Sequence, residues 1–184
     1  MQKKAFFIHG WGGAPEEGWR PWLGKELEKR GFVVANLLMP NSQNPVQAEW
    51  VEAISSAVGE PDENCYLVGH SLGVIAILRY LESLQDKSKV GGVILVAGFT
   101  NDLNIPELNN FFSTPINWAK IKHSGLKFVS IESDNDPYDL ARYNEDFAKY
   151  LGAKTILAHN MKHFSVKDGI KEVPLILDEI LSLS

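Results

Sequence analysis

Short apolar runs recur along this chain, and longer segments in which apolar side chains follow helical spacing separate them. The runs are nearly continuous rather than alternating with polar residues, which is typical of parallel strands covered on both faces. We therefore expect strands at these positions and helices between them. The runs occupy residues 5–8, 32–37, 65–69, 92–98, 127–132 and 154–159.

The segments between the runs predict the helices. One of them places Leu140, Tyr143, Phe147 and Leu151 on a single helical face. Alternation of strands and helices indicates right-handed βαβ units. The sequence therefore predicts an α/β fold, with a doubly wound sheet of about six parallel strands and helices on both faces. The predicted helices cover residues 15–31, 45–58, 71–84, 139–152 and 171–183.

Residues 99–124 fit this alternation less well. The segment is long for a connection inside a compact domain, and connections of this length tend to be functional or disordered. Phe111, Phe112 and Trp118 argue against disorder. These aromatic side chains form either an apolar wall for the acyl part of a substrate or the core of the segment. We expect a single domain over residues 1–184, with a short lid-like excursion at 99–124.

Composition and charge narrow the classes of function. The chain has 184 residues, of which 45% are hydrophobic and 22% charged, an ordinary composition for one globular domain. Its net charge of −5 argues against nucleic-acid binding, which usually needs a basic surface. No segment approaches the roughly 20 apolar residues that cross a bilayer. The single cysteine, Cys65, cannot form an internal disulfide, which fits a reducing compartment, and we expect a cytoplasmic protein.

The loop after the strand at 65–69 contains a candidate nucleophile. In doubly wound sheets, ligands bind beyond the carboxyl ends of the strands. This loop carries "GHSLG", which matches the G-x-S-x-G motif in the strand-to-helix context that the motif requires. A serine on such a strained turn is exposed for attack on a substrate, whereas the alternative is a tight turn with a purely structural role. We favour Ser71 as a nucleophile.

A nucleophile that attacks a carbonyl needs hydrogen-bond donors for the oxyanion. The motif supplies the backbone N–H of Leu72, and the second donor should come from the turn after the first strand. That turn is "HGWGG", residues 9–13, and the N–H of Trp11 is the expected donor. Gly12 and Gly13 also fit a simple tight turn before the next helix, and the two interpretations are compatible.

The serine needs a base, and the chain contains five histidines. His9 lies in the turn after the first strand, His70 directly precedes the nucleophile, and His123 lies in the lid-like segment. The chain order in such hydrolases is serine, acid, histidine, which leaves His159 and His163. His159 ends the last predicted strand, where side chains are often packed, whereas His163 lies in the following loop and can reach over the nucleophile. We favour His163 as the base.

The acid should follow the strand at 127–132, where "ESDNDPYD" offers aspartates at three positions. Asp139 lies near the start of the next helix, where a carboxylate interacts favourably with the helix dipole. Asp136 precedes Pro137, which disfavours helical geometry and keeps Asp136 in the loop. Asp134 is the alternative, although it also fits a solvated turn. We favour Asp136 as the residue that orients the imidazole.

With these motifs, the chain resembles the α/β-hydrolases, and more narrowly the small serine hydrolases of the YdeN and retinoblastoma-binding-protein-nine family. The resemblance covers nearly the whole chain and is densest in "FFSTPINWAKIKHSGLKFVSIESDNDPYD" and "MKHF". It implies a minimal hydrolase core without a large cap domain. It also implies a triad at Ser71, Asp136 and His163, with the aspartate directly before a proline, as it is here.

Two positions depart from the family pattern. In the family, glycine commonly precedes the last histidine, whereas here Lys162 precedes it, which could alter the flexibility of the loop without removing the base. The first turn, "HGWGG", looks more like the turn of larger esterases, and this likeness strengthens the assignment of Trp11 as an oxyanion donor.

The leading hypothesis is a carboxylesterase-like serine hydrolase that cleaves small esters, thioesters or amides through an acyl-enzyme on a Ser-His-Asp triad. We expect no cofactor and no metal, because no His, Cys and carboxylate cluster has metal-site spacing. The expected partner is a small acyl substrate, with no nucleic acid and no membrane, and the sequence does not indicate a protein partner. Two alternatives stay open: a protein-binding module that keeps the hydrolase scaffold, and a triad enzyme with another reaction, such as a lyase or perhydrolase.

Overall fold

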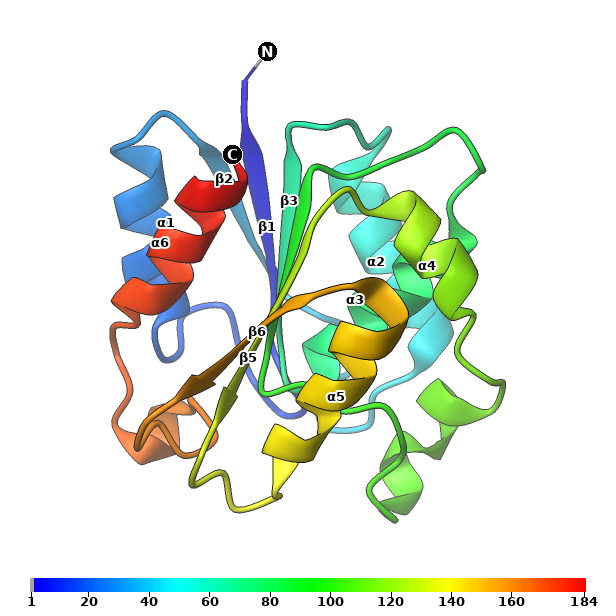
Figure 1. The fold of residues 1–184 in the computed structure, drawn as a ribbon, viewed down its shortest axis with the longest axis vertical. Helices are drawn as coiled ribbons and strands as arrows, with labels where there is room; N and C mark the ends of the chain where they lie inside the picture. Colours follow the sequence, from blue (N-terminus) through cyan, green and yellow to red (C-terminus); the bar gives the residue numbers. More distant parts are fainter. Residues whose placement is uncertain (1) are drawn as a thin grey trace.

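The computed structural model describes residues 2–184, and its centre is a six-stranded sheet in which all strands are parallel (Figure 1). The strand order is β2-β1-β3-β4-β5-β6. This confirms the predicted α/β fold with a doubly wound parallel sheet. The strands are β1 (Lys4–Ile8), β2 (Val33–Leu37), β3 (Cys65–His70), β4 (Gly92–Val96), β5 (Phe128–Ser133) and β6 (Lys154–Ala158).

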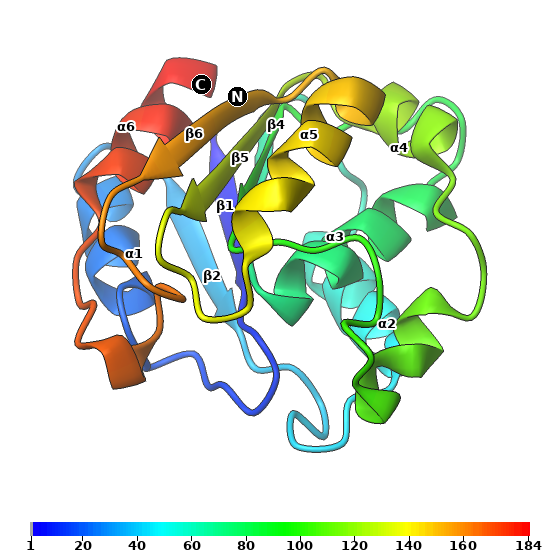
Figure 2. The ribbon, with the colours of Figure 1, turned by 60° about the horizontal axis from the view of Figure 1, so that its bottom comes forward.

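Helices cover both faces of the sheet (Figures 1 and 2). Helices α1 and α6 lie together on one face, and α2, α3, α4 and α5 lie on the other. No helix within residues 2–184 is long and apolar enough to cross a bilayer. The helices are α1 (Arg20–Glu28), α2 (Gln47–Val58), α3 (Leu72–Ser83), α4 (Trp118–Ser124), α5 (Asn144–Asp146) and α6 (Pro174–Leu183); a 3-10 helix (Leu140–Tyr143) precedes α5, and a π-helical turn (Phe147–Leu151) follows it.

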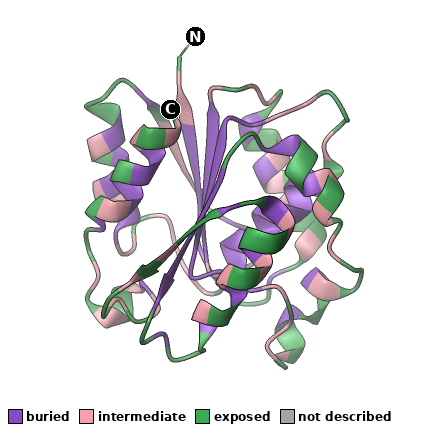
Figure 3. Cartoon of the chain, viewed as in Figure 1, coloured by how far each residue is buried: buried purple, intermediate pink, exposed green. Residues whose placement is uncertain are grey.

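The middle of the sheet forms the core (Figure 3). Every residue of β3, β4 and β5 is buried, which explains the continuous apolar pattern of these strands. β6 is an edge strand, and some of its residues, such as Leu157, are exposed. Helix α3 is buried from Leu72 to Leu81, because it packs between the sheet and its neighbours α2 and α4.

Two helices begin later than the sequence pattern predicts. The helix predicted at 15–31 begins at Arg20, because Gly18 has a φ of 65° and the residues before it form turns. The helix predicted at 171–183 begins at Pro174, which occupies its first position. Proline has no N–H to donate and disfavours helical geometry in the residue before it, so a helix more readily starts at proline than passes through it.

Residues 99–124 contain regular elements that the sequence pattern did not predict. A 3-10 helix spans Pro106–Phe112, and α4 is the crossover helix between β4 and β5. Arg79 of α3 holds this segment: its Nε donates to the carbonyl of Phe111 at 2.9 Å, and its Nη2 donates to that of Thr114 at 2.6 Å. The segment is therefore fixed against α3, and its use as a lid stays a prediction.

The strand order reverses at β1, because the chain passes from β1 to β2 on one side and then returns to β3 on the other. The connection after β1 leads to β2 on one side, and the connection after β3 leads to β4 on the other side. In doubly wound sheets, ligands bind where two neighbouring connections leave in opposite directions. Figure 2 turns the edge that holds the carboxyl ends of the strands toward the viewer. The loops at this edge carry the candidate residues.

Replacement of Gly73 by alanine tests how closely α3 approaches β1. A Cβ at position 73 would lie 2.3 Å from the carbonyl oxygen of Ile8 and 2.8 Å from that of His9. Both oxygens belong to the backbone, so the strand and the helix would have to separate. We expect Gly73→Ala to lower the free energy of unfolding by roughly 1–3 kcal/mol, measured by urea denaturation.

Gly24→Ala is the matched control. Gly24 lies in α1, and a Cβ there would make ordinary contacts, 3.5 Å from Val34 and 3.7 Å from Phe7. Because alanine favours a helix over glycine, we expect this variant to equal the wild type in stability or to exceed it by up to about 1 kcal/mol. Equal stability of the two variants would contradict the close approach at Gly73.

Candidate active site

Ser71 lies at the sharp turn between β3 and α3. Its φ of 54° and ψ of −120° form an uncommon conformation for a residue with a side chain. Its N–H donates to the carbonyl of Val96 at 2.9 Å, and its carbonyl accepts from the N–H of Val74 at 2.9 Å. The neighbouring strand and the first turn of α3 therefore hold this strained backbone in place.

His163 connects Ser71 to Asp136. Its Nε2 lies 3.0 Å from the Oγ of Ser71, and its Nδ1 lies 2.8 Å from the Oδ2 of Asp136. A carboxylate only accepts hydrogen bonds, so Nδ1 carries the proton and Nε2 accepts from the serine hydroxyl. The structure thus brings together the side chains that the sequence singled out, in the geometry of a nucleophile, a base and an orienting acid.

Asp136 is held by its own loop. Its side chain has 0% exposure, and its Oδ1 accepts from the N–H of Tyr138 at 2.8 Å. The ring of Tyr138 packs edge-on against that of His163, with the ring centroids 5.0 Å apart. One carboxylate oxygen is thus held by the backbone and the other faces the imidazole. Because water is excluded from this carboxylate, its hydrogen bond to His163 is strengthened.

Asp134 and His159, the alternatives for the acid and the base, form a separate pair. The Nδ1 of His159 hydrogen-bonds the Oδ2 of Asp134, and the Oδ1 of Asp134 accepts from the N–H of Asn160 at 2.9 Å. The bond from Asn160 first, and that from His159 second, lower the pKa of Asp134. The side chain of His159 is 80% exposed, so this pair belongs to a solvated turn outside the Ser71 arrangement.

The turn after β1 lies directly against Ser71. A Cβ on Gly10 would lie 3.0 Å from the Cβ of Ser71, so glycine is needed where the turn meets the serine. His9 is fully buried and fixes the turn: its Nδ1 donates to the carbonyl of Gly10 at 2.8 Å, and its Nε2 accepts from the N–H of Met39 at 3.1 Å. Burial lowers the pKa of His9, which matches this neutral tautomer.

Trp11 and Leu72 carry the N–H groups expected to bind an oxyanion. Leu72 is the first residue of α3, where an N–H has no partner inside the helix. The N–H that follows Trp11, from Gly12, donates to the carbonyl of Ser42 at 2.7 Å and fixes the turn. Within residues 2–184, the N–H groups of Trp11 and Leu72 donate to no protein acceptor. Their role as oxyanion donors stays a prediction.

The aromatic side chains of the lid-like segment pack against other elements. Phe111 is fully buried, and its ring lies edge-on to that of Trp50 in α2, with centroids 5.8 Å apart. Trp118 stacks on Tyr150, with centroids 4.9 Å apart, and Phe112 is partly buried. These contacts match the core interpretation for Phe111 and Trp118. A role for any of these side chains in substrate binding stays a prediction.

A cavity of about 420 Å³ is lined by Tyr138, whose ring packs against that of His163. Ser71, Asp136 and His163 are not among the residues that line this cavity. The other side chains that line the cavity are largely polar, and they come from the loop after β4 and from the 3-10 helix before α5: Asn101, Asp102, Leu103, Asn104, Ile105 and Arg142.

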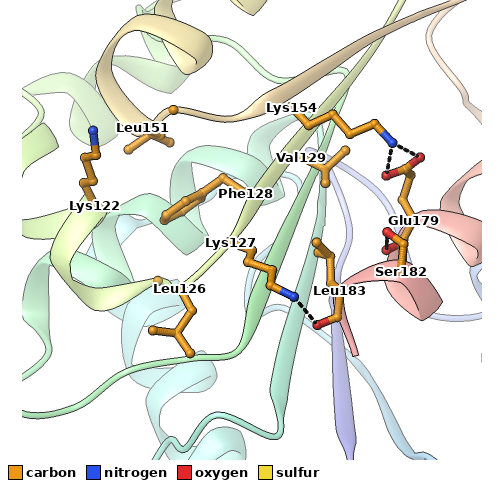
Figure 4. Close-up of a pocket in the computed structure, with 12 residues that line it drawn as sticks. Lys122, Leu126, Lys127, Phe128, Val129, Leu151, Lys154, Glu179, Ser182 and Leu183 are labelled. Carbon is orange, nitrogen blue, oxygen red and sulfur yellow. Dashed lines mark hydrogen bonds and ion pairs between the residues drawn. The ribbon is translucent and has the colours of Figure 1, made fainter.

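A second cavity, of about 360 Å³, lies near the amino ends of the strands, away from Ser71 (Figure 4). Figure 4 shows Lys154 bonded to Glu179, at 2.7 Å, and Lys127 bonded to the carbonyl of Leu183, at 3.2 Å. Its lining includes the amino ends of β5 and β6, so it is not part of the arrangement around Ser71. In the described part of the chain, no three His, Cys, Asp or Glu side chains are grouped to hold a metal ion.

Glu132 is a buried carboxyl group that the sequence did not single out, because it lies within the apolar pattern of β5. It is fully buried, its Oε1 accepts from the N–H of Gly98 at 2.8 Å, and its Oε2 has no partner in residues 2–184. Burial raises the pKa of Glu132 well above its ordinary range, and the charge of Asp136 adds to this rise. Burial therefore favours the protonated form of Glu132 over the charged form.

His70 and Trp19 also contact the site without having been assigned a role from the sequence. The Nε2 of His70 donates to the carbonyl of His163 at 2.8 Å, so His70 faces the loop of the base rather than the hydroxyl of Ser71. Burial, followed by the charges of His163 and Arg20, lowers the pKa of His70 well below its ordinary range. The signals in the sequence were the position of Trp19 inside the helix predicted at 15–31 and the position of His70 beside the serine.

Comparison with known proteins assigns the chain to a family. The sequence profile of the serine hydrolase family matches residues 5–182. The protein YdeN of Bacillus subtilis (strain 168) is 33% identical over 183 residues, which cover 99% of this chain and 96% of YdeN. The serine hydrolase RBBP9 of Rattus norvegicus is 31% identical over 166 residues, which cover 88% of this chain and 87% of RBBP9.

Solved structures agree with the sequence matches. The crystal structure of the ydeN gene product from B. subtilis superposes with a TM-score of 0.90 and covers 98% of both chains at 33% identity. A YdeN-like protein from Pectobacterium atrosepticum superposes with a TM-score of 0.73 at 17% identity, covering 99% of this chain and 90% of that one. At that identity, the second match shows a shared fold alone.

Replacement of Glu132 by glutamine tests the protonated state of this buried group. The folded protein keeps the proton at pH values where the unfolded chain has lost it, so the free energy of unfolding falls as the pH rises above the ordinary carboxyl pKa. The amide of Glu132→Gln is neutral at every pH. Above the ordinary carboxyl pKa, we expect the free energy of unfolding of Glu132→Gln to rise relative to that of the wild type by up to about 1.4 kcal/mol per pH unit. Urea denaturation at several pH values measures this difference.

Glu60→Gln is the control, because Glu60 is exposed in the turn after α2. The free energy of unfolding of Glu60→Gln should change with pH as that of the wild type does, across the same pH range. The difference between Glu132→Gln and the wild type should shrink as the pH falls toward the ordinary carboxyl pKa, where both states of the wild type are protonated. Parallel curves for Glu132→Gln and the wild type would contradict a protonated Glu132.

Proposed function

The chain belongs to the serine hydrolase family and is a hydrolase, and we propose that it cleaves small esters, thioesters or amides through an acyl-enzyme on Ser71. One observation carries the proposal: the hydrogen-bonded line from Ser71 through His163 to Asp136, with distances of 3.0 and 2.8 Å. A serine hydroxyl is activated when a base within hydrogen-bond reach takes its proton and a third group orients that base.

In the first half of the reaction, the Oγ of Ser71 attacks the substrate carbonyl carbon while the Nε2 of His163 takes the hydroxyl proton. Asp136 keeps the proton on Nδ1 and stabilises the imidazolium that forms. The carbonyl oxygen becomes an oxyanion, and the N–H groups of Trp11 and Leu72 stabilise it. The bond to the leaving group then breaks, and His163 gives its proton to the departing alcohol, thiol or amine.

In the second half, a water molecule attacks the acyl-enzyme. The Nε2 of His163 takes a proton from the water as the new carbon–oxygen bond forms. The bond between Ser71 and the acyl group breaks, His163 returns the proton to the Oγ of Ser71, and the carboxylic acid leaves. No group outside these side chains and backbone amides is needed to balance the steps.

The surroundings of the site support a small acyl substrate. Ser71, Asp136 and His163 lie at the carboxyl ends of β3, β5 and β6, in short loops at the rim of the sheet. The long connection after β4 is tied to α3 by Arg79, so it packs on the core of the protein. These features favour a shallow site close to the sheet edge.

A fluorophosphonate probe tests the proposed nucleophile. The probe forms a covalent bond with an activated serine, so we expect the wild type to be labelled and Ser71→Ala to show no labelling. The extent of labelling is measured by intact-protein mass spectrometry, and thermal unfolding confirms that the variant is folded. Retained labelling of Ser71→Ala would remove Ser71 from this role, and a folded wild type that neither reacts with the probe nor turns over p-nitrophenyl acetate would overturn the proposed function.

The two aspartates that the sequence left as rivals give a matched pair of variants. Asp136→Asn removes the charge that orients and stabilises the His163 imidazole, and we expect kcat for p-nitrophenyl acetate to fall by roughly 10³–10⁴-fold. Asp134→Asn makes the same chemical change in the exposed pair with His159 and should leave kcat within about 3-fold of the wild type. An equal loss in both variants would contradict the assignment of the acid.

A further inference from the structure

The loop that carries His163 does not have a conformation that its own residues prefer. Asn160, Lys162 and Phe164 all have positive φ, at 56°, 48° and 53°. Asparagine adopts this region readily, whereas for Lys162 and Phe164 it is sparsely populated and persists only where surrounding contacts enforce it. Contacts from outside the loop therefore help to determine where the imidazole lies. Ser133 and Asn135 accept hydrogen bonds from the N–H groups of Met161 and Lys162, at 3.0 and 2.8 Å, and other contacts reach the carbonyls of the loop.

His70 supplies the first of these contacts. Its Nε2 lies 2.8 Å from the carbonyl oxygen of His163, and its ring centroid lies 5.1 Å from that of His163. The carbonyl oxygen only accepts, so Nε2 carries a proton and donates it. His70 is the residue before Ser71 in the chain. The bond from His70 therefore closes a small ring: Ser71 and His70 are covalently joined, His70 binds the backbone of His163, and the His163 side chain binds Ser71.

Trp19 supplies the second contact, one residue further along the loop. Its Nε1 donates to the carbonyl of Phe164 at 3.1 Å, and the residue is fully buried. The rings of Trp19 and His70 pack edge-on, with centroids 6.1 Å apart. Two successive carbonyls of the loop, from His163 and Phe164, are thus held by two buried N–H donors that also pack against each other.

Packing alone does not account for this pair of side chains. An apolar side chain would fill the position of His70 without the cost of burying a polar ring, and burying such a ring is tolerated only when it is hydrogen-bonded. Trp19 lies just before α1 and His70 ends β3, so both donors belong to parts of the core that the loop itself does not control. The two hydrogen bonds therefore fix the position of the loop relative to the core of the protein.

We propose that His70 and Trp19 are positioning residues that clamp the His163 loop and set the Nε2 of His163 against the hydroxyl of Ser71. This inference rests on the proposed function, because it assigns the clamp to the base of that reaction. A displacement of a catalytic group by about 1 Å can cost on the order of 10²-fold in rate. Loss of a clamp contact should therefore lower kcat and leave the KM for a small substrate nearly unchanged.

The test compares His70→Leu, which removes the donor, with His70→Gln, whose amide nitrogen can reach the same carbonyl. With p-nitrophenyl acetate, we expect His70→Leu to lose about 10–100-fold in kcat with KM within about 2-fold, and His70→Gln to stay within about 3-fold of the wild type. Trp19→Phe keeps most of the ring but loses the N–H, and should lose about 3–10-fold in kcat.

His123→Leu is the matched control. The Nε2 of His123 also donates to a backbone carbonyl, that of Asp86, at 2.9 Å, but on the exposed surface between α3 and α4. This variant removes the same kind of hydrogen bond away from the base, so kcat and KM should equal those of the wild type. A comparable loss of kcat in His123→Leu would show that the effect is not specific to the clamp and would overturn the proposal.

A proton NMR signal gives a readout that does not depend on turnover. An imidazole Nδ1–H bonded to a carboxylate resonates far downfield, and the bond from His163 to Asp136 should give such a signal. We expect the signal in the wild type, His70→Gln and His123→Leu, and its broadening or loss in His70→Leu. If the wild type neither reacts with the fluorophosphonate nor turns over ester, the proposed function fails, whereas this signal still tests the clamp.

Three results would overturn the clamp itself. The first is wild-type kcat together with an intact downfield signal in folded His70→Leu. The second is an equal loss of kcat in His70→Leu and His70→Gln when both variants are folded, because this result would assign His70 a packing role. If His70→Leu does not fold, Trp19→Phe decides, and wild-type kcat in folded Trp19→Phe is the third.

Discussion

The backbone of Ser71, with a φ of 54°, is the constraint on which the rest of the arrangement depends. Holding such a residue in this region costs on the order of 1–3 kcal/mol, so both flanking elements must be rigid. β3 is buried in the middle of the sheet, and α3 is pressed against β1 at Gly73. The same packing places the N–H of Leu72 and the turn after β1 beside the hydroxyl of Ser71. The packing that holds the strained backbone of Ser71 therefore also positions the candidate oxyanion donors.

The other members of the site come from the far half of the sheet. All strands are parallel, so the loops after β5 and β6 emerge at the same edge as Ser71. Loops at the same edge can still lie far apart, and here two strands separate β3 from β6. Buried polar contacts close this distance: Asp136 holds the imidazole of His163 from one side, and His70 holds its backbone from the other.

The chain contains two Asp–His pairs of similar spacing, and burial distinguishes them. The side chain of Asp136 is 0% exposed, whereas that of His159, in the second pair, is 80% exposed. An exposed ion pair contributes little energy and holds little geometry, while a buried one fixes both partners.

The sequence alone predicted the six strands and the tight turn at Ser71, because strand burial and turn chemistry depend on neighbouring residues. It also singled out Ser71, Asp136 and His163, which the structure brings within hydrogen-bond distance of one another. The tertiary structure alone shows the buried donors that bind the loop of the base and the burial that raises the pKa of Glu132. Trp19 and the carbonyl of Phe164 are 145 residues apart, and a hydrogen bond over that separation leaves no periodic signal in the chain. Its partners meet only because the sheet and α1 have already folded around them.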